Sequence, residues 1–428
     1  MWQRRHFSRN IRAIIRKVEE MKKIIIISDF IEGKPVVASV RYADLMQHIN
    51  KCYETIVINN KFLGAYKSEY AKVNYKFNTI RSRFTQTLED KEISKSYNKF
   101  EKILRNKFIL SIWRNYSSSK IKFNKLNFNL FNQVNNILQN NDICAIFITV
   151  PDIHGLYIVD YIKRRYSNVP VIVEVRDIIN HNIGKGNPRY TMKNAEKLLI
   201  FRADGIIALS DGIYEYYKKM DGNKKIKVIR NGYNEEEFSE CRYASLKDKK
   251  KITLAHIGSI YKGRNLADFI EALIKISEKR DVPIEFDVVG YLDNEALSDF
   301  EYLRNKINQS RVNINLVGTV QHKKAIRYLK KCDISVVLTH KTGSDYAIPG
   351  KAFEYIGACK PIIAVTTNKE LIELIDGTYG ECAGHNIEEI VDKLLCIMKS
   401  EYNFEDRLIF SRENQANNII NFIEEIAT

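Results

Sequence analysis

The chain has 428 residues, 45% hydrophobic and 28% charged, which is enough for two or three globular domains and excludes a disordered or collagen-like composition. Its net charge is +16, which favours anionic partners. No apolar run approaches the ~18 residues that a membrane-spanning helix needs. The N-terminus also lacks the continuous apolar segment of a signal peptide. We therefore expect a globular protein that works in the cytoplasm.

The positive charge is concentrated near the N-terminus. Residues 1–130 hold 27 Lys and Arg against 11 Asp and Glu, so the rest of the chain is neutral overall. Basic residues interleaved with aromatic ones, as in KVNYKFNTIRSRF, are typical of surfaces that bind nucleic acid, an anionic membrane or an anionic ligand. A solvated helix face has the same pattern. Residues 1–20 form a basic extension, either an amphipathic helix lying on a surface or a segment upstream of a natural start at Met21.

The cysteines and the missing motifs narrow the chemistry. The seven cysteines are an odd number and contain no CxxC pair, which favours reduced, mostly buried thiols. The sequence has no GxxxxGK[ST], HExxH or GxGxxG motif, and its eight His are scattered. We therefore expect neither a metal site nor a bound cofactor.

Short apolar runs alternate with helical patterns along the first half of the chain. Strands are expected at 24–28, 55–58, 145–150, 171–175, 205–209 and 227–229, with helices between them, for example at 156–165 and 212–219. This alternation predicts an α/β domain with a parallel sheet. Residues 61–135 interrupt the pattern, and we interpret them as a basic, aromatic and helix-like elaboration of that domain.

A second alternating series follows the polar stretch 234–251. Strands are expected at 252–257, 286–289, 314–317, 334–338 and 361–365, and helices at 266–279, 297–308, 323–330, 350–357, 369–374 and 388–400. The predicted organisation is one α/β domain over 21–236, a second over 237–410, and a final helix over 411–428.

The first candidate site lies where a strand of the second domain ends. The strand stops at Ile257, and a loop with two glycines and two cations, Gly258, Lys262, Gly263 and Arg264, leads into the next helix. Ligands of open α/β sheets bind at the carboxyl ends of strands. Glycines let the backbone approach a phosphate, and cations neutralise it. The same residues also fit an ordinary loop with solvated charges.

The second candidate is the segment AIPGKAFEYIGACKPIIAV at 347–365. Pro349 suits the first position of a helix, so the N–H groups of Gly350 and Lys351 can face an anion above the helix start. Glu354 lies one turn further on the same face. Its carboxylate can accept both hydroxyls of a ribose, or it can simply interact with the helix dipole. Two such strand ends fit a nucleoside diphosphate better than a single anion.

The second domain resembles the donor half of GT-B glycosyltransferases, in particular glycosyltransferase family 4, the group 1 glycosyltransferases. The matching stretches are 257–265, 286–290 (FDVVG), 317–320 (VGTV), 328–338 (YLKKCDISVVL) and 349–365 in the second domain, and 173–178 (VEVRDI), 203–212 (ADGIIALSDG) and 228–238 (VIRNGYNEEEF) in the first. The resemblance covers residues 21–60 and 140–428. It implies an α/β fold of two Rossmann-like domains that face each other across a cleft, with a C-terminal crossover helix returning to the first domain.

The resemblance also implies roles for individual residues. The donor-binding set is Gly258, Ser259, Lys262, Arg264, Val320, Tyr346, Gly350, Lys351 and Glu354. In this set Lys262 or Arg264 binds the diphosphate, Glu354 holds the ribose, and the backbone near Val320 lines the base pocket. The catalytic set is Arg176, Asp177 and Lys262, and Gly33 and Lys34 face the acceptor.

Three positions depart from the family pattern. Many members carry a second Glu eight residues before the ribose-binding one, where this chain has Tyr346. Ser259 stands where many relatives have an Arg, so the diphosphate would depend on the cations that follow. Cys359 replaces the usual helix-ending Gly, which costs about 1–2 kcal/mol if that position is left-handed.

The resemblance implies a retaining transferase that moves a sugar from a nucleotide-diphosphate sugar to a hydroxyl acceptor. Catalysis would come from neutralising the leaving diphosphate and from closing two domains over the substrates. The basic N-terminal part suits a protein on the inner face of the cell membrane with a polyprenyl-linked or oligosaccharide acceptor, as in capsule, lipopolysaccharide or exopolysaccharide synthesis. The alternatives are a nucleotide-sugar 2-epimerase of the same fold and a nucleic-acid-binding protein. We expect no nucleic acid partner, because no compact binding motif is present.

Overall fold

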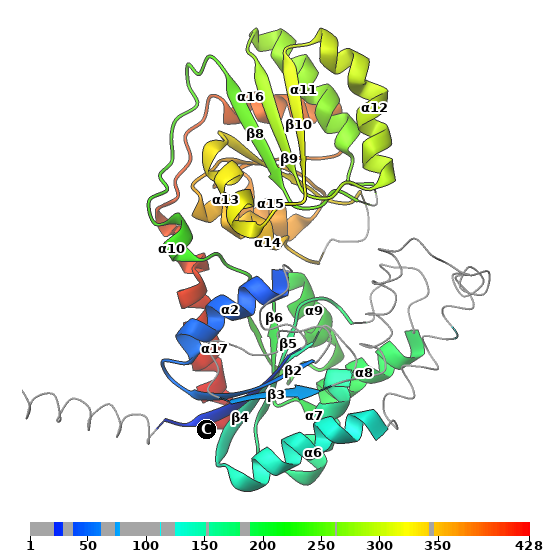
Figure 1. Ribbon diagram of the computed structural model, residues 1–428, viewed down its shortest axis with the longest axis vertical. Helices are drawn as coiled ribbons and strands as arrows, with labels where there is room; N and C mark the ends of the chain where they lie inside the picture. Colours follow the sequence, from blue (N-terminus) through cyan, green and yellow to red (C-terminus); the bar gives the residue numbers. More distant parts are fainter. Residues whose placement is uncertain are drawn as a thin grey trace, which may run out of the picture. The chain divides into compact units, whose positions relative to one another are not determined.

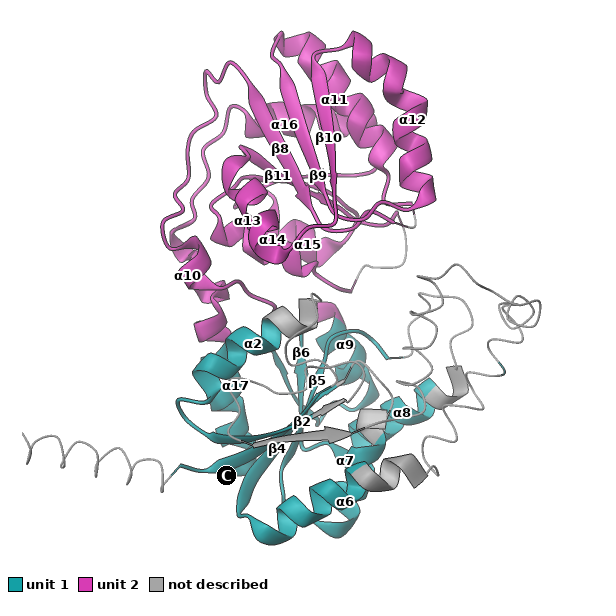
Figure 2. Ribbon diagram, viewed as in Figure 1, with its two compact units in different colours: residues 1–209, 213–229, 416–428 teal, residues 210–212, 230–415 magenta. Residues whose placement is uncertain are grey.

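The computed structural model describes residues 21–28, 37–60, 73–77, 112, 125–150, 154–179, 189–261, 263–341 and 346–428 (Figure 1). The chain divides into two compact units (Figure 2). Unit 1 comprises Met1–Leu209, Ile213–Ile229 and Ala416–Thr428, and unit 2 comprises Ser210–Gly212 and Arg230–Gln415. Each unit is built on one parallel sheet with helices packed against it, as the alternating pattern predicts.

Among the described residues, the sheet of unit 1 has seven strands in the order β3-β2-β1-β4-β5-β6-β7, and neighbouring strands run parallel. The strands are β1 (Lys23–Ser28), β2 (Glu54–Asn60), β3 (Val73–Phe77), β4 (Ile143–Val150), β5 (Val171–Val175), β6 (Gly205–Ala208) and β7 (Lys225–Val228). The helices are α2 (Val37–Ile49), α6 (Lys125–Asn140), α7 (His154–Arg165), α8 (Arg189–Arg202) and α9 (Asp211–Met220), the last beginning in residues that cluster with unit 2. Strands β5 and β6 are buried throughout, because both faces of a parallel sheet are covered.

The edge of this sheet corrects one expectation. Residues 61–135 were predicted to be helix-like, but β3 adds an edge strand within them at Val73–Phe77. Its sequence, VNYKF, alternates apolar and polar residues with the period of a strand. The prediction is correct for residues 125–135, which belong to helix α6. The remaining part of this region lies outside the described residues, and so does the extension 1–20.

The last helix, α17 (Arg412–Ala427), belongs largely to unit 1. Its residues Ala416, Ile419 and Phe422 are buried in the core that also contains strands of this sheet. A methyl group on Gly205 of β6 would lie 3.0 Å from the Phe422 ring, so helix and strand pack closely. The crossover helix predicted from the family resemblance is therefore confirmed.

In the described part of unit 2, six strands form a sheet in the order β10-β9-β8-β11-β12-β13, again with parallel neighbours. The strands are β8 (Ile252–Ile257), β9 (Ile284–Val289), β10 (Val312–Gly318), β11 (Ile334–Leu338), β12 (Ile362–Val365) and β13 (Gly380–Ala383). The helices are α10 (Glu235–Phe238), α11 (Leu266–Arg280), α12 (Asn294–Gln309), α13 (His322–Lys331), α14 (Gly350–Gly357), α15 (Lys369–Ile375), α16 (Ile387–Ile397) and the 3-10 helix η1 (Glu405–Phe410).

The strand order of unit 2 reverses between β8 and β11, where the connection changes direction. Helix α11 packs with α12 and α16, α13 packs on β8, and α14 packs on β11 and β12 (Figure 1). Open α/β sheets bind ligands at the carboxyl ends of strands beside such a reversal. Both candidate segments lie there, because one follows β8 and the other forms α14 after β11.

All seven cysteines are free, as their number and spacing predict. Within the described ranges, no helix combines the length and the apolar character needed to cross a membrane.

Candidate functional site

Helix α14 spans Gly350–Gly357, the range that the sequence predicts. Pro349 is its N-cap, with φ −59° and ψ 127°, and Gly350 is the first helical residue. The prediction that Pro349 takes the first helical position is wrong, because its ψ is extended. Its ring fixes φ at a value that suits the N-cap as well as the first helical position. The N–H of Ala352 donates to the Pro349 carbonyl at 3.0 Å. Gly350 and Lys351 therefore form the start of the helix, as expected.

A buried tyrosine fixes α14 against the sheet. The N–H of Ile257, at the end of β8, donates to the Tyr355 hydroxyl at 2.9 Å. That hydroxyl lies 3.3 Å from the carbonyl oxygen of Val336 in β11. Burial raises the pKa of Tyr355 well above its ordinary value, so the hydroxyl keeps its proton. The helix carrying Lys351 and Glu354 is thus held at the ends of the two central strands.

Two basic side chains meet in the middle of the site. Nζ of Lys351 lies 2.9 Å from Nε2 of His256, a fully buried residue of β8. Burial lowers the pKa of His256 well below its ordinary value, and the charges of Lys351 and Arg264 add to this effect. Sequence reasoning missed His256, because a single His in an apolar strand is typical of a core residue. Its position just before the glycine loop is the sequence feature that could have marked His256 as a site residue.

Arg264 is held by its own loop. Its Nη1 donates to the Ser259 carbonyl at 2.9 Å, and its guanidinium carbon lies 4.3 Å from the centre of the Tyr261 ring. Nε lies 3.5 Å from Nε2 of His340. Burial lowers the pKa of Arg264. Among the described residues no carboxylate forms an ion pair with Arg264, so its charge has no anionic partner in this part of the structure.

Open space lies beside Gly258, with Lys351 at its edge. Gly258 has φ +119°, and a Cβ built on it would have one described atom within 4 Å, Nζ of Lys351 at 4.0 Å. Gly290, at the end of β9, has φ +148°, and a Cβ there would overlap the Gly258 carbonyl oxygen at 2.3 Å. Burial and then Arg264 lower the pKa of Lys351 well below its ordinary value, while Glu354 opposes them. This arrangement is suited to an anion, which would supply the missing negative charge.

Glu354 lies next to a second histidine. Its Oε1 is 3.8 Å from Nε2 of His322, the first residue of α13, and the same nitrogen is 3.5 Å from Oε2 of Glu237 in α10. Val320, predicted near the base pocket, is partly buried two residues before α13. Sequence reasoning missed His322 and Glu237, because nothing in the spacing of the three residues shows that their side chains meet.

Tyr346 and Cys359 occupy the two divergent family positions on this segment. The Ser210 hydroxyl donates to the carbonyl of Tyr346, and a Cβ on Gly212 would lie 2.8 Å from the Tyr346 Cα. Cys359 has φ +54°, so the position is left-handed and carries the predicted cost of about 1–2 kcal/mol. Its thiol is buried and contacts the Arg407 guanidinium. These two positions are thus used for packing within unit 2.

The predicted catalytic pair lies in unit 1, directly after β5. Arg176 is partly buried and Asp177 is exposed. In the strand before them, the buried Glu174 pairs with Arg41 at 2.8 Å and accepts a hydrogen bond from the Tyr42 hydroxyl. Burial, followed by the charge of Glu174, raises the pKa of Tyr42. This buried network fixes α2 to the end of β5. The other predicted residues, Gly33, Lys34 and Lys262, lie outside the described residues.

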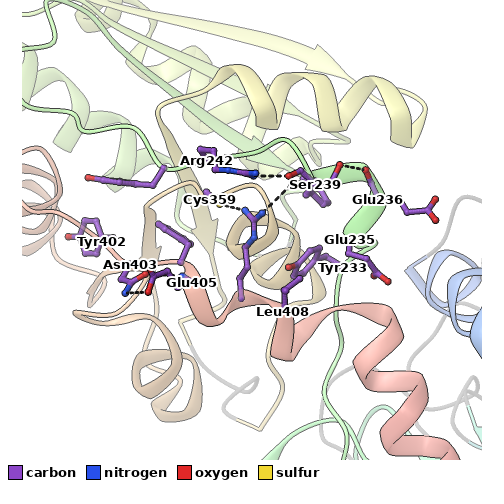
Figure 3. A pocket seen from close by; sticks show the side chains of 14 residues that line it. Tyr233, Glu235, Glu236, Ser239, Arg242, Cys359, Tyr402, Asn403, Glu405 and Leu408 are labelled. Atoms are coloured by element: carbon purple, nitrogen blue, oxygen red, sulfur yellow. Dashed lines mark hydrogen bonds between the residues drawn. The ribbon is translucent and has the colours of Figure 1, made fainter.

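A cavity of about 640 Å³ lies at the opposite end of α14 (Figure 3). Arg407, in its wall, donates to the Gly357 carbonyl at 3.1 Å, which ties the cavity to the last residue of the helix. The lining residues are Tyr233, Glu235, Glu236, Phe238, Ser239, Arg242, Tyr243, Cys359, Tyr402, Asn403, Phe404, Glu405, Arg407 and Leu408. No residue of the predicted donor, acceptor or catalytic sets is among them. Its lining contains two Arg and three Glu, so its charge favours neither an anionic nor a cationic ligand.

Comparison with known proteins finds a family match for most of unit 2. Residues 237–416 match the family model of glycosyl transferases group 1. An uncharacterized glycosyltransferase of Methanocaldococcus jannaschii is 25% identical over 238 residues, which are 54% of this chain and 57% of that protein. The chain thus spans little more than half the length of this curated relative.

Solved structures share the fold over nearly the whole chain. HepE of Anabaena in complex with UDP has a TM-score of 0.59 at 13% identity, covering 95% of this chain and 100% of that one. The lipopolysaccharide outer core galactosyltransferase WaaB, in its apo form, has a TM-score of 0.55 at 14% identity, covering 94% and 99%. UDP-GlcNAc 2-epimerase from Methanocaldococcus jannaschii has a TM-score of 0.53 at 12% identity, covering 95% and 100%. Residues 237–416 therefore match the group 1 glycosyl transferases, and the chain as a whole has the GT-B fold.

Proposed function

We propose that the protein is a glycosyltransferase that takes a sugar from a nucleotide-diphosphate sugar and transfers it to a hydroxyl acceptor. The observation that carries the proposal is the open space beside Gly258 at the end of β8, with Lys351 at its edge and the Arg264 charge acting on Lys351. Arg264 has no carboxylate partner among the described residues, and Glu354 is the one carboxylate that opposes the lowered pKa of Lys351. A diphosphate provides two anionic groups of the right chemistry for this site.

Glu354 is the residue proposed to bind the ribose of the donor. It lies one helical turn after Lys351, and helix residues at this spacing share a face. A ligand whose diphosphate contacts Lys351 would have its ribose within reach of this carboxylate. The match of residues 237–416 to group 1 glycosyl transferases supports the same orientation. Val320, Gly350 and Ser259 complete the proposed donor site through backbone contacts.

In this mechanism the protein stabilises the leaving diphosphate with fixed positive charge. Lys351 and Arg264 neutralise the charge that develops as the bond to the sugar breaks, and Lys262 is proposed to join them. Arg176 and Asp177 are proposed to face the transferred sugar, and Gly33 and Lys34 the acceptor. With no carboxylate nucleophile assigned, transfer is proposed to retain the configuration of the sugar carbon without a covalent intermediate.

A panel of UDP-, GDP-, ADP- and dTDP-sugars tests the proposal by thermal shift, because a ligand that binds the native state raises its melting temperature. HepE, which shares the fold, is known in complex with UDP, so we expect the UDP-sugars to give the largest shift. Lys351→Met and Glu354→Ala should reduce the shift. A panel in which no nucleotide sugar stabilises the wild-type protein would refute the donor assignment.

The acceptor is proposed to be lipid-linked, or a growing surface polysaccharide such as capsule, lipopolysaccharide or exopolysaccharide. The basic composition of residues 1–130 supports a position against an anionic membrane surface. The 2-epimerase of the same fold is the competing activity. Incubation of the preferred nucleotide sugar without acceptor separates the two, because an epimerase converts it to the 2-epimer whereas a transferase leaves it largely unchanged.

A further inference from the structure

One histidine joins three separate elements beside the proposed ribose site. His322 starts α13, Glu237 belongs to α10, and Glu354 belongs to α14. Nε2 of His322 lies 3.5 Å from Glu237 and 3.8 Å from Glu354. The three side chains are 34%, 29% and 19% exposed, so water screens these interactions only in part. A single imidazole is therefore shared by two carboxylates that come from distant parts of the sequence.

The imidazole separates two like charges. Two carboxylates near one position each disfavour the ionised state of the other, and a cation between them removes this cost. The hydrogen bond from His322, followed by its charge, lowers the pKa of Glu237 against the opposing effect of burial. Lys323 and Lys330, both on α13, act on Glu237 in the same direction. Carboxylates of α10 and α14 thus lie beside His322, and two lysines of its own helix act on the Glu237 carboxylate.

The contact between His322 and Glu354 is electrostatic. At 3.8 Å it is longer than a hydrogen bond, so it acts by charge. An ionised carboxylate has about four acceptor positions, so a charge contact with His322 does not by itself prevent hydrogen bonds from ribose hydroxyls.

We propose that His322 is a positioning residue for donor binding, which holds Glu354 in the orientation that receives the ribose by bridging it to Glu237. The inference rests on the proposed function, since it assigns a support to the ribose-binding carboxylate. It also adds α10 and α13 to the elements that form the donor site.

The test measures the dissociation constant of a nucleoside diphosphate, chosen as the one among UDP, GDP, ADP and dTDP that stabilises the wild-type protein most. His322→Gln should weaken binding about three- to five-fold, the size of a partly exposed ion pair. Lys324→Gln, on the exposed side of the same helix, should bind like wild type. Melting temperatures of both variants, measured without ligand, report any general loss of structure.

The pH dependence separates positioning from a structural role. An imidazole changes charge between about pH 5 and 8, so wild-type affinity should fall as pH rises through that range. His322→Gln is neutral throughout and should show no such step. Glu237→Gln removes a negative charge that favours the protonated imidazole, so the step should move to lower pH.

The two variants separate a failure of the proposed ribose site from a failure of the positioning role of His322. If Glu354→Ala binds the diphosphate as tightly as wild type, the ribose assignment itself is wrong. If Glu354→Ala weakens binding but His322→Gln keeps both wild-type affinity and the wild-type pH step, only the positioning role is overturned. Loss of melting temperature in His322→Gln with an unchanged pH step would also overturn it.

Discussion

Nζ of Lys351 lies 2.9 Å from Nε2 of His256, so two basic groups face each other beneath the glycine loop. Burial and then the Arg264 charge lower the pKa of Lys351 well below its ordinary value. Without an anion, burial and the Arg264 charge thus disfavour the protonated form of Lys351 at the end of β8. The proposed diphosphate would reverse this effect, because a nearby negative charge favours the protonated form.

Diphosphate binding should therefore be accompanied by proton uptake. The pKa of Lys351 starts below its ordinary value and rises in the complex, so protons are taken up at a pH between the two values. Calorimetric titrations at several pH values below the ordinary lysine pKa of about 10.4, in buffers of different ionisation enthalpy, measure the number of protons taken up. We expect a positive number for wild type and a number close to zero for Lys351→Met. Equal uptake by the two proteins would contradict this account.

Gly258→Ala should weaken donor binding about ten-fold or more, because the new methyl group enters the open space beside Lys351. It also strains the backbone at φ +119°, at a cost of about 1–3 kcal/mol. Gly377→Ala is a matched control, since Gly377 has φ +72° and open space around it. We expect the control to lose stability without losing affinity. If the two variants bind the diphosphate equally well, this open space is not where it binds.

Tyr355→Phe should lower the free energy of unfolding by about 1–3 kcal/mol, because it leaves the buried N–H of Ile257 without its partner. It should weaken donor binding as well, since α14 is no longer tied to the end of β8. Urea denaturation measures the first effect and calorimetry the second. Tyr302→Phe, at a residue 82% exposed, is the control. A Tyr355→Phe protein as stable as wild type would show that this hydroxyl does not fix the helix.

The basic N-terminal part predicts binding to anionic vesicles. Sedimentation with anionic liposomes should carry the protein into the pellet at low salt and leave it in the supernatant at high salt. The reason is that the distance over which charges attract each other becomes shorter as ionic strength rises. Neutral liposomes serve as the control. If the protein stays in the supernatant with anionic liposomes at both salt concentrations, the proposed membrane-surface location is wrong.

Most of the fold could be predicted from buried apolar runs, because parallel strands covered on both faces have continuous apolar sequences. The prediction of strands failed where a strand lacks such a continuous apolar sequence. Strand β13 (Gly380–Ala383) has the sequence GECA, without a β-branched residue, yet it is buried throughout. The edge strand β3 was missed because its lysine and asparagine resemble the basic and polar residues around it.

The site was predicted in outline, through the glycine loop and Lys351 with Glu354. The contacts that define its electrostatics were not, because they join residues far apart in sequence. His256 and Lys351 are 95 positions apart, and His322 meets carboxylates from two other helices. Only the folded backbone brings these side chains together. Local spacing could likewise not show that Tyr355 connects α14 to two strands.

The most direct test of the donor site is the affinity of Glu354→Ala for the preferred nucleoside diphosphate, measured by calorimetry against wild type. The account predicts a dissociation constant about 10- to 100-fold higher, because the ribose loses one or two hydrogen bonds to a charged group. An unchanged dissociation constant, with the melting temperature also unchanged, would contradict it.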